Sequence, residues 1–261
     1  MKLAKSKEYW DRMGSADSMW AILSAREKLG GQWQTDEFFA TGRAEVDATM
    51  RTLEGLGVRV DRSRALDFGC GIGRLTQALA EHFDSVVGVD IASTMIAQAE
   101  SHNAFGERCT YRVNDTDDLA QFPDGSFSFV FSHIVLQHIK APHSSNYLRE
   151  FARVAAPGAL IVFQLPARNP NARRSVLAAV RKLINVSPVL VRLYRRLFFK
   201  NVTRSTLDAL PPALVVMEGI DRKTVSELLA AQGVRILHTE RDGTQEFAAL
   251  TSWFYVAQKD A

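Results

Sequence analysis

The sequence predicts an α/β fold: a mostly parallel sheet of seven strands, with helices on both faces and a terminal antiparallel strand. Two observations support this prediction. From Arg64 onward, short apolar runs alternate with helix-length segments, which is the pattern of strand–helix–strand units. The last two apolar runs have only about a dozen residues between them and no helical periodicity, which favours an antiparallel connection.

The expected elements follow in chain order. Val86–Val89 is a continuous apolar run, typical of a parallel strand covered on both faces. Helical spacing of apolar residues follows the first strand, and Ser93 is expected to begin the next helix. Later helices are expected over residues 147–154 and 224–231. The seven strands are expected at residues 65–68, 86–90, 111–113, 127–132, 160–163, 234–239 and 253–257.

Composition limits the class of protein. The chain has 261 residues, of which 46% are hydrophobic and 23% charged, as in one large globular domain with an elaboration. This excludes a disordered tail and a small disulfide-stapled module. Cys70 and Cys109 form neither a redox pair nor a four-ligand zinc site, so a reducing cytoplasm is expected. No signal peptide or membrane span is predicted.

Three parts of the chain are distinguished. Residues 1–63 are expected to form a separate helical lead-in. Residues 64–261 form the main domain, and residues 166–220 are a basic helical insertion after the fifth strand. Ten basic residues and no acidic ones lie between Pro166 and Arg204, although the net charge of the whole chain is only +3.

The basic insertion has several possible roles. Apolar residues recur there at helical spacing, which predicts a pair of basic amphipathic helices with a break near Pro188. The pair is interpreted as a lid over a phosphate-bearing acceptor, a surface that docks on anionic lipid through residues 170–204, or a nucleic-acid groove. Few aromatic residues lie among the basic ones, which disfavours nucleic acid. The alternative is that the insertion is only a solvent-exposed basic surface and has no binding role.

A glycine-rich turn follows the first strand. The run DFGCGIG at residues 67–73 has its third glycine one position earlier than dinucleotide-binding loops, and Arg74 follows it. The Asp67 carboxylate would repel a pyrophosphate, so the loop favours a ligand with a positive group. Asp90 ends the second strand, where a carboxylate can accept both ribose hydroxyls. S-adenosylmethionine has such a positive group, a ribose and no phosphate.

These residues resemble a known family. The run LDFGCGIG at residues 66–73, together with GVDI at residues 88–91, is similar to the class I S-adenosylmethionine-dependent methyltransferases. The resemblance implies a Rossmann-like fold, S-adenosylmethionine as cofactor, and an adenine that meets the Asp115 carboxylate and the Thr116 backbone. It also implies that the lead-in of residues 1–63, which is rich in aromatic residues, covers the cofactor site, with residues 39–42 nearest the methionine part. The cofactor-binding residues that it implies are Asp67, Gly69, Cys70, Gly71, Gly73, Asp90, Ile91, Met95, Asn114, Asp115, Thr116 and Ser132.

Three histidines follow the fourth strand, at the edge of the sheet where substrates bind in open α/β folds. His138 is the first candidate for a general base that removes the acceptor's proton, and His133 is the second. The alternative is that His138 only fixes a loop, since many methyltransferases work without a base. No metal site is predicted, because the histidines lack ligand spacing and acidic companions.

The sequence therefore predicts a methyltransferase that modifies an oxygen, or else a nitrogen, of a small-molecule or glycan acceptor, either anionic or lipid-linked. A cytoplasmic location with peripheral contact at the inner membrane face is expected, and the oligomeric state is not predicted. Two alternatives stay open. One is a nicotinamide-dependent oxidoreductase, and the other is a membrane- or partner-binding module that keeps the pocket without catalysis.

Overall fold

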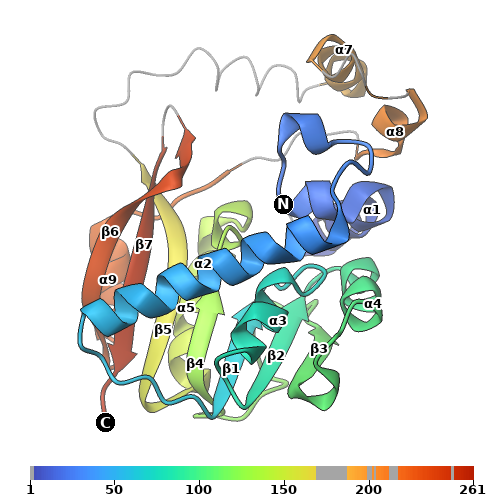
Figure 1. Cartoon of the computed structure of the whole chain (residues 1–261). Coiled ribbons are helices and arrows are strands. Elements are labelled where there is room, and N and C mark those ends of the chain that lie inside the picture. The colour runs from blue at the N-terminus through green and yellow to red at the C-terminus, as the bar shows by residue number, and fades with distance from the viewer. Residues whose placement is uncertain (1–2, 169–186, 199–201, 203, 212–216, 248–249) are drawn as a thin grey trace.

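The computed structural model describes residues 3–168, 187–198, 202, 204–211, 217–247 and 250–261. A seven-stranded sheet forms its centre (Figure 1). The strands are β1 (Arg64–Phe68), β2 (Ser85–Asp90), β3 (Cys109–Val113), β4 (Phe127–Ser132), β5 (Ala155–Arg168), β6 (Val234–Phe247) and β7 (Leu250–Lys259). The helices are α1 (Leu3–Ile22), α2 (Thr35–Gly55), α3 (Arg74–Ala80), α4 (Ser93–Ser101), α5 (Ala141–Val154), α7 (Pro188–Phe198), α8 (Arg204–Ala209) and α9 (Arg222–Ala230), with 3-10 turns η1 (Arg26–Lys28), η2 (Gly106–Arg108) and η3 (Leu136–His138).

The strand order is β3-β2-β1-β4-β5-β7-β6, which confirms the predicted fold class. Strands β1 to β5 pair in parallel, and β7 is antiparallel to both β5 and β6. From β1 the chain first moves to one side through β2 and β3, and then returns to the other side through β4 and β5. The order therefore reverses between β1 and β4, and ligands of open α/β sheets bind beyond the strand ends at such a reversal.

Two apolar clusters cover the two faces of the sheet. Helices α2 and α3 pack on one face through residues such as Leu53 and Leu79, both fully buried, and Figure 1 shows α2 crossing that face. Helices α5 and α9 pack on the other face through Phe151 and Leu229. Because both faces are covered, the strand ends and the loops after them are the exposed part of the sheet where a ligand can enter.

The lead-in is held against the main domain by polar contacts. Asp11 of α1 accepts a hydrogen bond of 3.0 Å from the Thr94 backbone N–H in the first turn of α4. The Arg12 guanidinium donates to the backbone carbonyls of Asp208 and Ala209 in α8, at 3.0 and 2.9 Å. Apolar residues of α1, α4 and α8 also form one cluster. Helix α1 therefore lies between α4 and α8, above the carboxyl end of the sheet (Figure 1).

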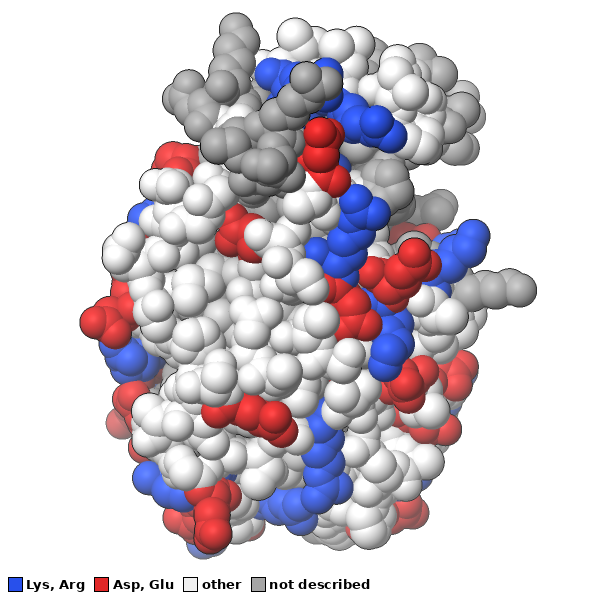
Figure 2. Space-filling view, turned by 90° about the vertical axis from the view of Figure 1, so that its right-hand side faces the viewer, with Lys and Arg blue, Asp and Glu red and all other residues white. Residues whose placement is uncertain are grey.

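Part of the basic insertion is described. Helix α7 confirms helical structure from Pro188, whereas the predicted helix before Pro188 lies outside the described residues. Four apolar side chains of α7 are exposed: Val189, Leu190, Leu193 and Leu197. In Figure 2, basic residues lie beside uncharged ones at the end of the molecule that carries α7 and α8 in Figure 1. No helix in the described part of the chain is long and apolar enough to cross a bilayer.

Candidate functional site

A cavity lies at the carboxyl ends of β1, β2 and β4, beneath α1. Its floor and walls are made by the loop after β1, the end of β2 and the segment after β4, and α1 contributes Leu3, Ser6 and Trp10. The lining is mainly apolar, with a few polar groups set among apolar side chains. Such a cavity at the reversal of strand order is the ordinary place for a small-molecule ligand.

The glycine loop forms one wall through its backbone. Gly69 and Cys70 donate their backbone N–H groups to the Val89 carbonyl at 2.8 and 3.0 Å, which holds the loop against the end of β2. Gly69 has φ +80°, and a Cβ there would collide with the Val135 side chain. At Gly71, with φ +53°, a Cβ would lie 2.5 Å from Cδ1 of Ile22. Only glycine fits these two positions, and the cavity reaches the backbone because side chains are absent there.

Asp90 stands at the end of β2 and faces this loop. Its Oδ2 accepts the Gly71 backbone N–H at 3.0 Å, and its Oδ1 accepts the Ala92 N–H at 2.9 Å. Burial raises the pKa of Asp90, and the two backbone N–H groups oppose that shift by stabilising the carboxylate. Each carboxylate oxygen accepts more than one hydrogen bond, so Asp90 can still receive the two hydroxyls of a ribose.

Asp67 lies deeper than Asp90, at 1% exposure. The Thr76 hydroxyl donates to its Oδ2 at 2.6 Å, whereas its Oδ1 has no hydrogen-bond partner among the described residues. Burial raises the pKa of Asp67 to about 7, although Thr76 and the charge of Arg74 lower it. A buried carboxylate oxygen without a partner is costly, and a cationic ligand group would satisfy it. Asp67 does not itself line the cavity, so the ammonium group of S-adenosylmethionine would reach it only through water.

The segment after β4 carries a charged cluster. Nδ1 of His133 forms an ion pair with Glu45 of α2, and its Nε2 lies 3.7 Å from Oδ2 of Asp242 in β6. Arg74 donates to the other Glu45 oxygen at 2.9 Å. Burial lowers the pKa of His133, but Glu45 and Asp242 raise it more strongly, to about 9. His133 is therefore a cation at neutral pH and lines the cavity beside two carboxylates.

The surroundings of His138 favour the neutral imidazole, whereas those of His133 favour the charged form. Burial lowers its pKa to about 4, which leaves the imidazole neutral at physiological pH. Its Nε2 lies 3.2 Å from Nε2 of Gln137, and the Trp10 ring of α1 packs edge-on against it at 5.3 Å between ring centroids. His138, which follows β4, lines the same cavity as Ile91 and Met95, which follow β2. The two candidate bases therefore differ in charge.

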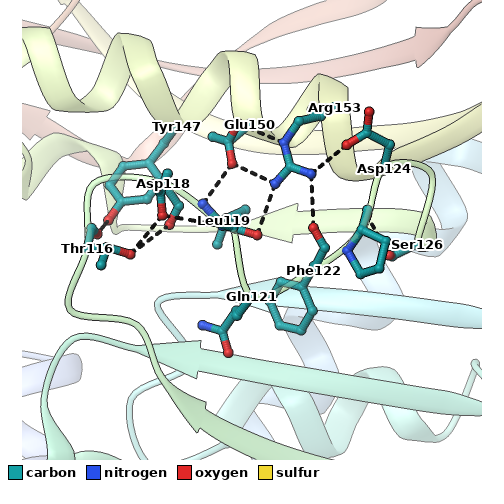
Figure 3. A network of polar contacts seen from close by, with 12 residues as sticks. Thr116, Asp118, Leu119, Gln121, Phe122, Asp124, Ser126, Tyr147, Glu150 and Arg153 are labelled. Atoms are coloured by element: carbon teal, nitrogen blue, oxygen red, sulfur yellow. Dashed lines mark hydrogen bonds and ion pairs between the residues drawn. The ribbon is translucent and has the colours of Figure 1, made fainter.

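The loop after β3 is fixed by a polar network shared with α5 (Figure 3). Arg153 donates to the backbone carbonyls of Leu119 and Phe122, both at 2.9 Å, and to Glu150 and Asp124. Glu150 in turn accepts the Leu119 backbone N–H at 2.7 Å. The residues before this network carry the expected adenine contacts, so α5 holds that wall in place.

Seven of the twelve predicted cofactor-binding residues line the cavity, and the other five do not: Asp67, Gly73, Asp115, Thr116 and Ser132. Asp115 forms an ion pair of 3.2 Å with Lys7 of α1, and the Thr116 carbonyl accepts the Tyr147 hydroxyl. Ser132 is fully buried and donates to the Phe68 carbonyl at 3.1 Å. Gly73 begins α3 with a left-handed φ. The predicted residues that line the cavity are Gly69, Cys70, Gly71, Asp90, Ile91, Met95, Asn114, His133 and His138.

Several lining residues were not predicted. From the lead-in, Trp10 and Ile22 line the cavity, whereas the expected segment at residues 39–42 does not. Its Gly42 instead packs against the backbone of Arg74. Ile134 also lines the cavity, and its φ of +60° is the one positive value outside glycine in the described part of the chain. A β-branched residue gives no sequence signal for this conformation, which such residues rarely adopt.

Comparisons with known proteins find similarity to methyltransferases. Residues 66–163 match the model of the methyltransferase domain family. The ubiquinone biosynthesis O-methyltransferase of Pseudomonas syringae is 30% identical over 126 residues, covering 48% of this chain and 53% of that protein. The same-named protein of Methylococcus capsulatus is 29% identical over 167 residues, covering 62% and 69%. The chain thus spans about half the length of the curated relative from Pseudomonas syringae.

The fold has solved counterparts. The magnesium protoporphyrin IX methyltransferase of Synechocystis, crystallised with bound S-adenosylhomocysteine, superposes with a TM-score of 0.61 at 20% identity, covering 98% of this chain and 99% of that one. A methyltransferase of Methanosarcina mazei gives a TM-score of 0.56 at 22% identity, covering 80% and 97%. The same sheet and flanking helices therefore occur in these two methyltransferase structures.

Proposed function

We propose that this chain, a class I S-adenosylmethionine-dependent methyltransferase, transfers the cofactor's methyl group to an oxygen of a small-molecule or glycan acceptor. The observation that supports this most directly is the pair of carboxylates at neighbouring strand ends. Asp90 faces the glycine loop with lone pairs to spare, and among the described residues Oδ1 of the buried Asp67 has no hydrogen-bond partner. A nucleoside with a positive group and no phosphate suits both.

The residues of the chain mainly hold the cofactor and the acceptor and orient them toward each other. S-adenosylmethionine supplies a methyl group that its sulfonium already activates. Asp90 would bind the ribose, the backbone at Gly69 and Gly71 would lie against the methionine part, and Asn114 to Thr116 would surround the adenine. Holding two reactants in line can supply about 7–11 kcal/mol of the barrier reduction. A fixed cavity with few polar groups is therefore sufficient for much of the rate enhancement.

The acceptor would enter at the His133 and His138 end of the cavity. These two residues follow β4, whereas the proposed ribose site lies at the end of β2. The relatives from Pseudomonas syringae and Methylococcus capsulatus carry the name O-methyltransferase, which supports oxygen as the modified atom. Lys140 also lines this end and is exposed, so an acceptor with negative charge would meet a cation there.

The acceptor or its carrier would be presented at a membrane. Helix α7 exposes Val189 by 67%, Leu193 by 53% and Leu197 by 57%, which lie along one side at helical spacing. Arg192 and Arg196 are exposed on the same helix, and no acidic residue occurs in it. Apolar and basic side chains on one surface helix suit the headgroup region of an anionic bilayer.

Calorimetry tests the proposed activity against the oxidoreductase alternative. Purified protein is titrated separately with S-adenosylhomocysteine and with NADH. We expect micromolar affinity for the first and none for the second, and NADH binding alone would reject the proposal. Labelled S-adenosylmethionine is then incubated with cell extracts fractionated by charge and lipid content. Transfer of label to an organic-soluble or acidic fraction is expected, and binding without any transfer would favour the non-catalytic module.

A further inference from the structure

A chain of buried amides fixes the orientation of His138. Gln164 of β5 and Gln137 of η3 are both completely buried. The Ile134 backbone N–H lies 3.2 Å from Oε1 of Gln164, and a backbone N–H is always a donor. Nε2 of Gln164 must then point the other way, where it donates to Oε1 of Gln137 at 3.2 Å and to the Ser252 hydroxyl.

The same hydrogen-bond argument decides which ring nitrogen of His138 carries the proton. Since Oε1 of Gln137 accepts from Gln164, its Nε2 faces Nε2 of His138 at 3.2 Å. An amide NH₂ only donates, so Nε2 of His138 must be the acceptor. In a neutral imidazole the proton then lies on Nδ1. Reversing the Gln137 amide would set its NH₂ against that of Gln164, which would lose one hydrogen bond and oppose two donors.

In the part of the chain that the structure describes, the protonated nitrogen has no hydrogen-bond partner. Nδ1 of His138 is buried and makes no hydrogen bond to any described residue, although the ring lines the cavity. Trp10 packs against the ring through its aromatic edge and leaves this nitrogen unpaired. Buried polar groups are almost always paired, so a buried N–H in a cavity wall indicates a ligand atom that accepts it.

We propose that His138 donates its Nδ1–H to the oxygen that receives the methyl group, and that this oxygen is ionised before transfer. The inference rests on the proposed function. A neutral histidine with its proton on Nδ1 offers the cavity a donor rather than a base. The acceptor is then a phenol, an enol or a carboxylic acid, whose oxygen is acidic enough to lose its proton to solvent when neighbouring donors stabilise the anion, and not a sugar alcohol.

The methyl-transfer step requires no general base. A lone pair of the ionised oxygen forms the new C–O bond to the methyl carbon. The C–S bond breaks with its electron pair on sulfur, so the sulfonium becomes a neutral thioether and the oxygen loses its negative charge. No proton leaves in this step. The exposed Lys140 lines the same cavity as His138, and its positive charge favours the ionised oxygen beforehand, whereas the charge of His133 is balanced by Glu45 and Asp242.

Gln137 and Gln164 are positioning residues in this scheme. Ile134, with its left-handed φ, turns its N–H toward Gln164 and sets the direction of the whole chain. Ser252 accepts from Gln164 and donates to Asp242 at 3.1 Å, so the amides also connect to the charged cluster around His133. The direction of every bond is consistent from Ile134 to His138.

Nitrogen NMR of the histidine rings tests the tautomer without any acceptor. In the intact ¹⁵N-labelled protein, we expect His138, assigned by its loss in His138→Asn, to carry its proton on Nδ1 with no titration between pH 5.5 and 8. In Gln137→Glu the new carboxylate accepts from Nε2, so the proton should move to Nε2. A wild-type ring protonated on Nε2, or one that titrates near pH 6.5, would overturn the inference even if methyl transfer is confirmed.

Activity provides the second measurement, using labelled S-adenosylmethionine and the acceptor-containing extract fraction. Asparagine places an amide N–H close to the position of Nδ1 but cannot act as a base. His138→Asn should therefore stay within about threefold of wild type, whereas His138→Ala should lose about 10- to 100-fold, as for a lost hydrogen bond to a charged group. Equal losses in both variants, with cofactor affinity intact, would restore the general-base role. Failure of the wild type to transfer any methyl would refute the proposed function and leave the tautomer to the NMR result.

Discussion

Asp67 has a pKa of about 7, so its charge changes within the physiological range. In the free protein the carboxyl is protonated below this pH and ionised above it, and a cationic ligand binds the ionised form. The affinity for S-adenosylhomocysteine should therefore increase as the pH rises from about 5.5 to 7.5, by at most about tenfold per unit. Calorimetry across this range measures the slope. Asp67→Asn should remove it, and an unchanged slope in that variant would exclude Asp67 as the group responsible.

For single residues, the sequence predicted those that lie directly at the end of a strand. Gly69, Gly71 and Asp90 follow directly from the turn after β1 and the end of β2. The partners of His133 were not predictable, because Glu45 comes from α2 and Asp242 from β6. Neither has a local pattern that sets it apart from a surface carboxylate, so only the folded chain reveals that His133 is charged.

Among the elements, α5 fixes the loop that carries the expected adenine contacts. Arg153 satisfies two backbone carbonyls of that loop and two carboxylates (Figure 3). Arg153→Met should destabilise the protein by about 2 kcal/mol, because the loop carbonyls lose a charged donor. Thermal unfolding measures this as a fall of about 4–8 °C in Tm. Arg149→Met, at an exposed position of the same helix, is the matched control and should change stability by less than about 0.5 kcal/mol. A similar Tm for both variants would show that the network does not stabilise the loop.

The order of strands and helices was predictable because apolar periodicity and strand length are local properties. The sequence also indicated the antiparallel return, and the structure places β7 between β5 and β6 rather than at the sheet edge. The contribution of α1 to the cavity was only partly predicted. Its aromatic residues suggested a cover, but Trp10 and Ile22 were not distinguishable from residues of an ordinary helix core.

At the scale of the whole molecule, the exposed basic and apolar side chains of α7 support the proposed contact with a membrane. Vesicles of phosphatidylcholine with phosphatidylglycerol should sediment the protein, whereas vesicles of phosphatidylcholine alone should not. The double variant Leu193→Glu, Leu197→Glu should weaken this binding by more than about tenfold, because two leucines no longer enter the apolar layer. Leu56→Glu is the matched control, since Leu56 is an exposed leucine at the end of α2. Undiminished binding of the double variant would exclude α7 as the docking surface, and binding only to another protein would replace the bilayer as partner.

The central claim is that Asp90 at the end of β2 holds the ribose of S-adenosylmethionine. Titration of wild type and Asp90→Ala with S-adenosylhomocysteine tests it directly. The variant should lose about 1.5–3 kcal/mol of binding free energy, as expected when hydrogen bonds to a charged group are removed. An unchanged affinity in a variant that unfolds at the wild-type temperature would contradict the assignment of this site.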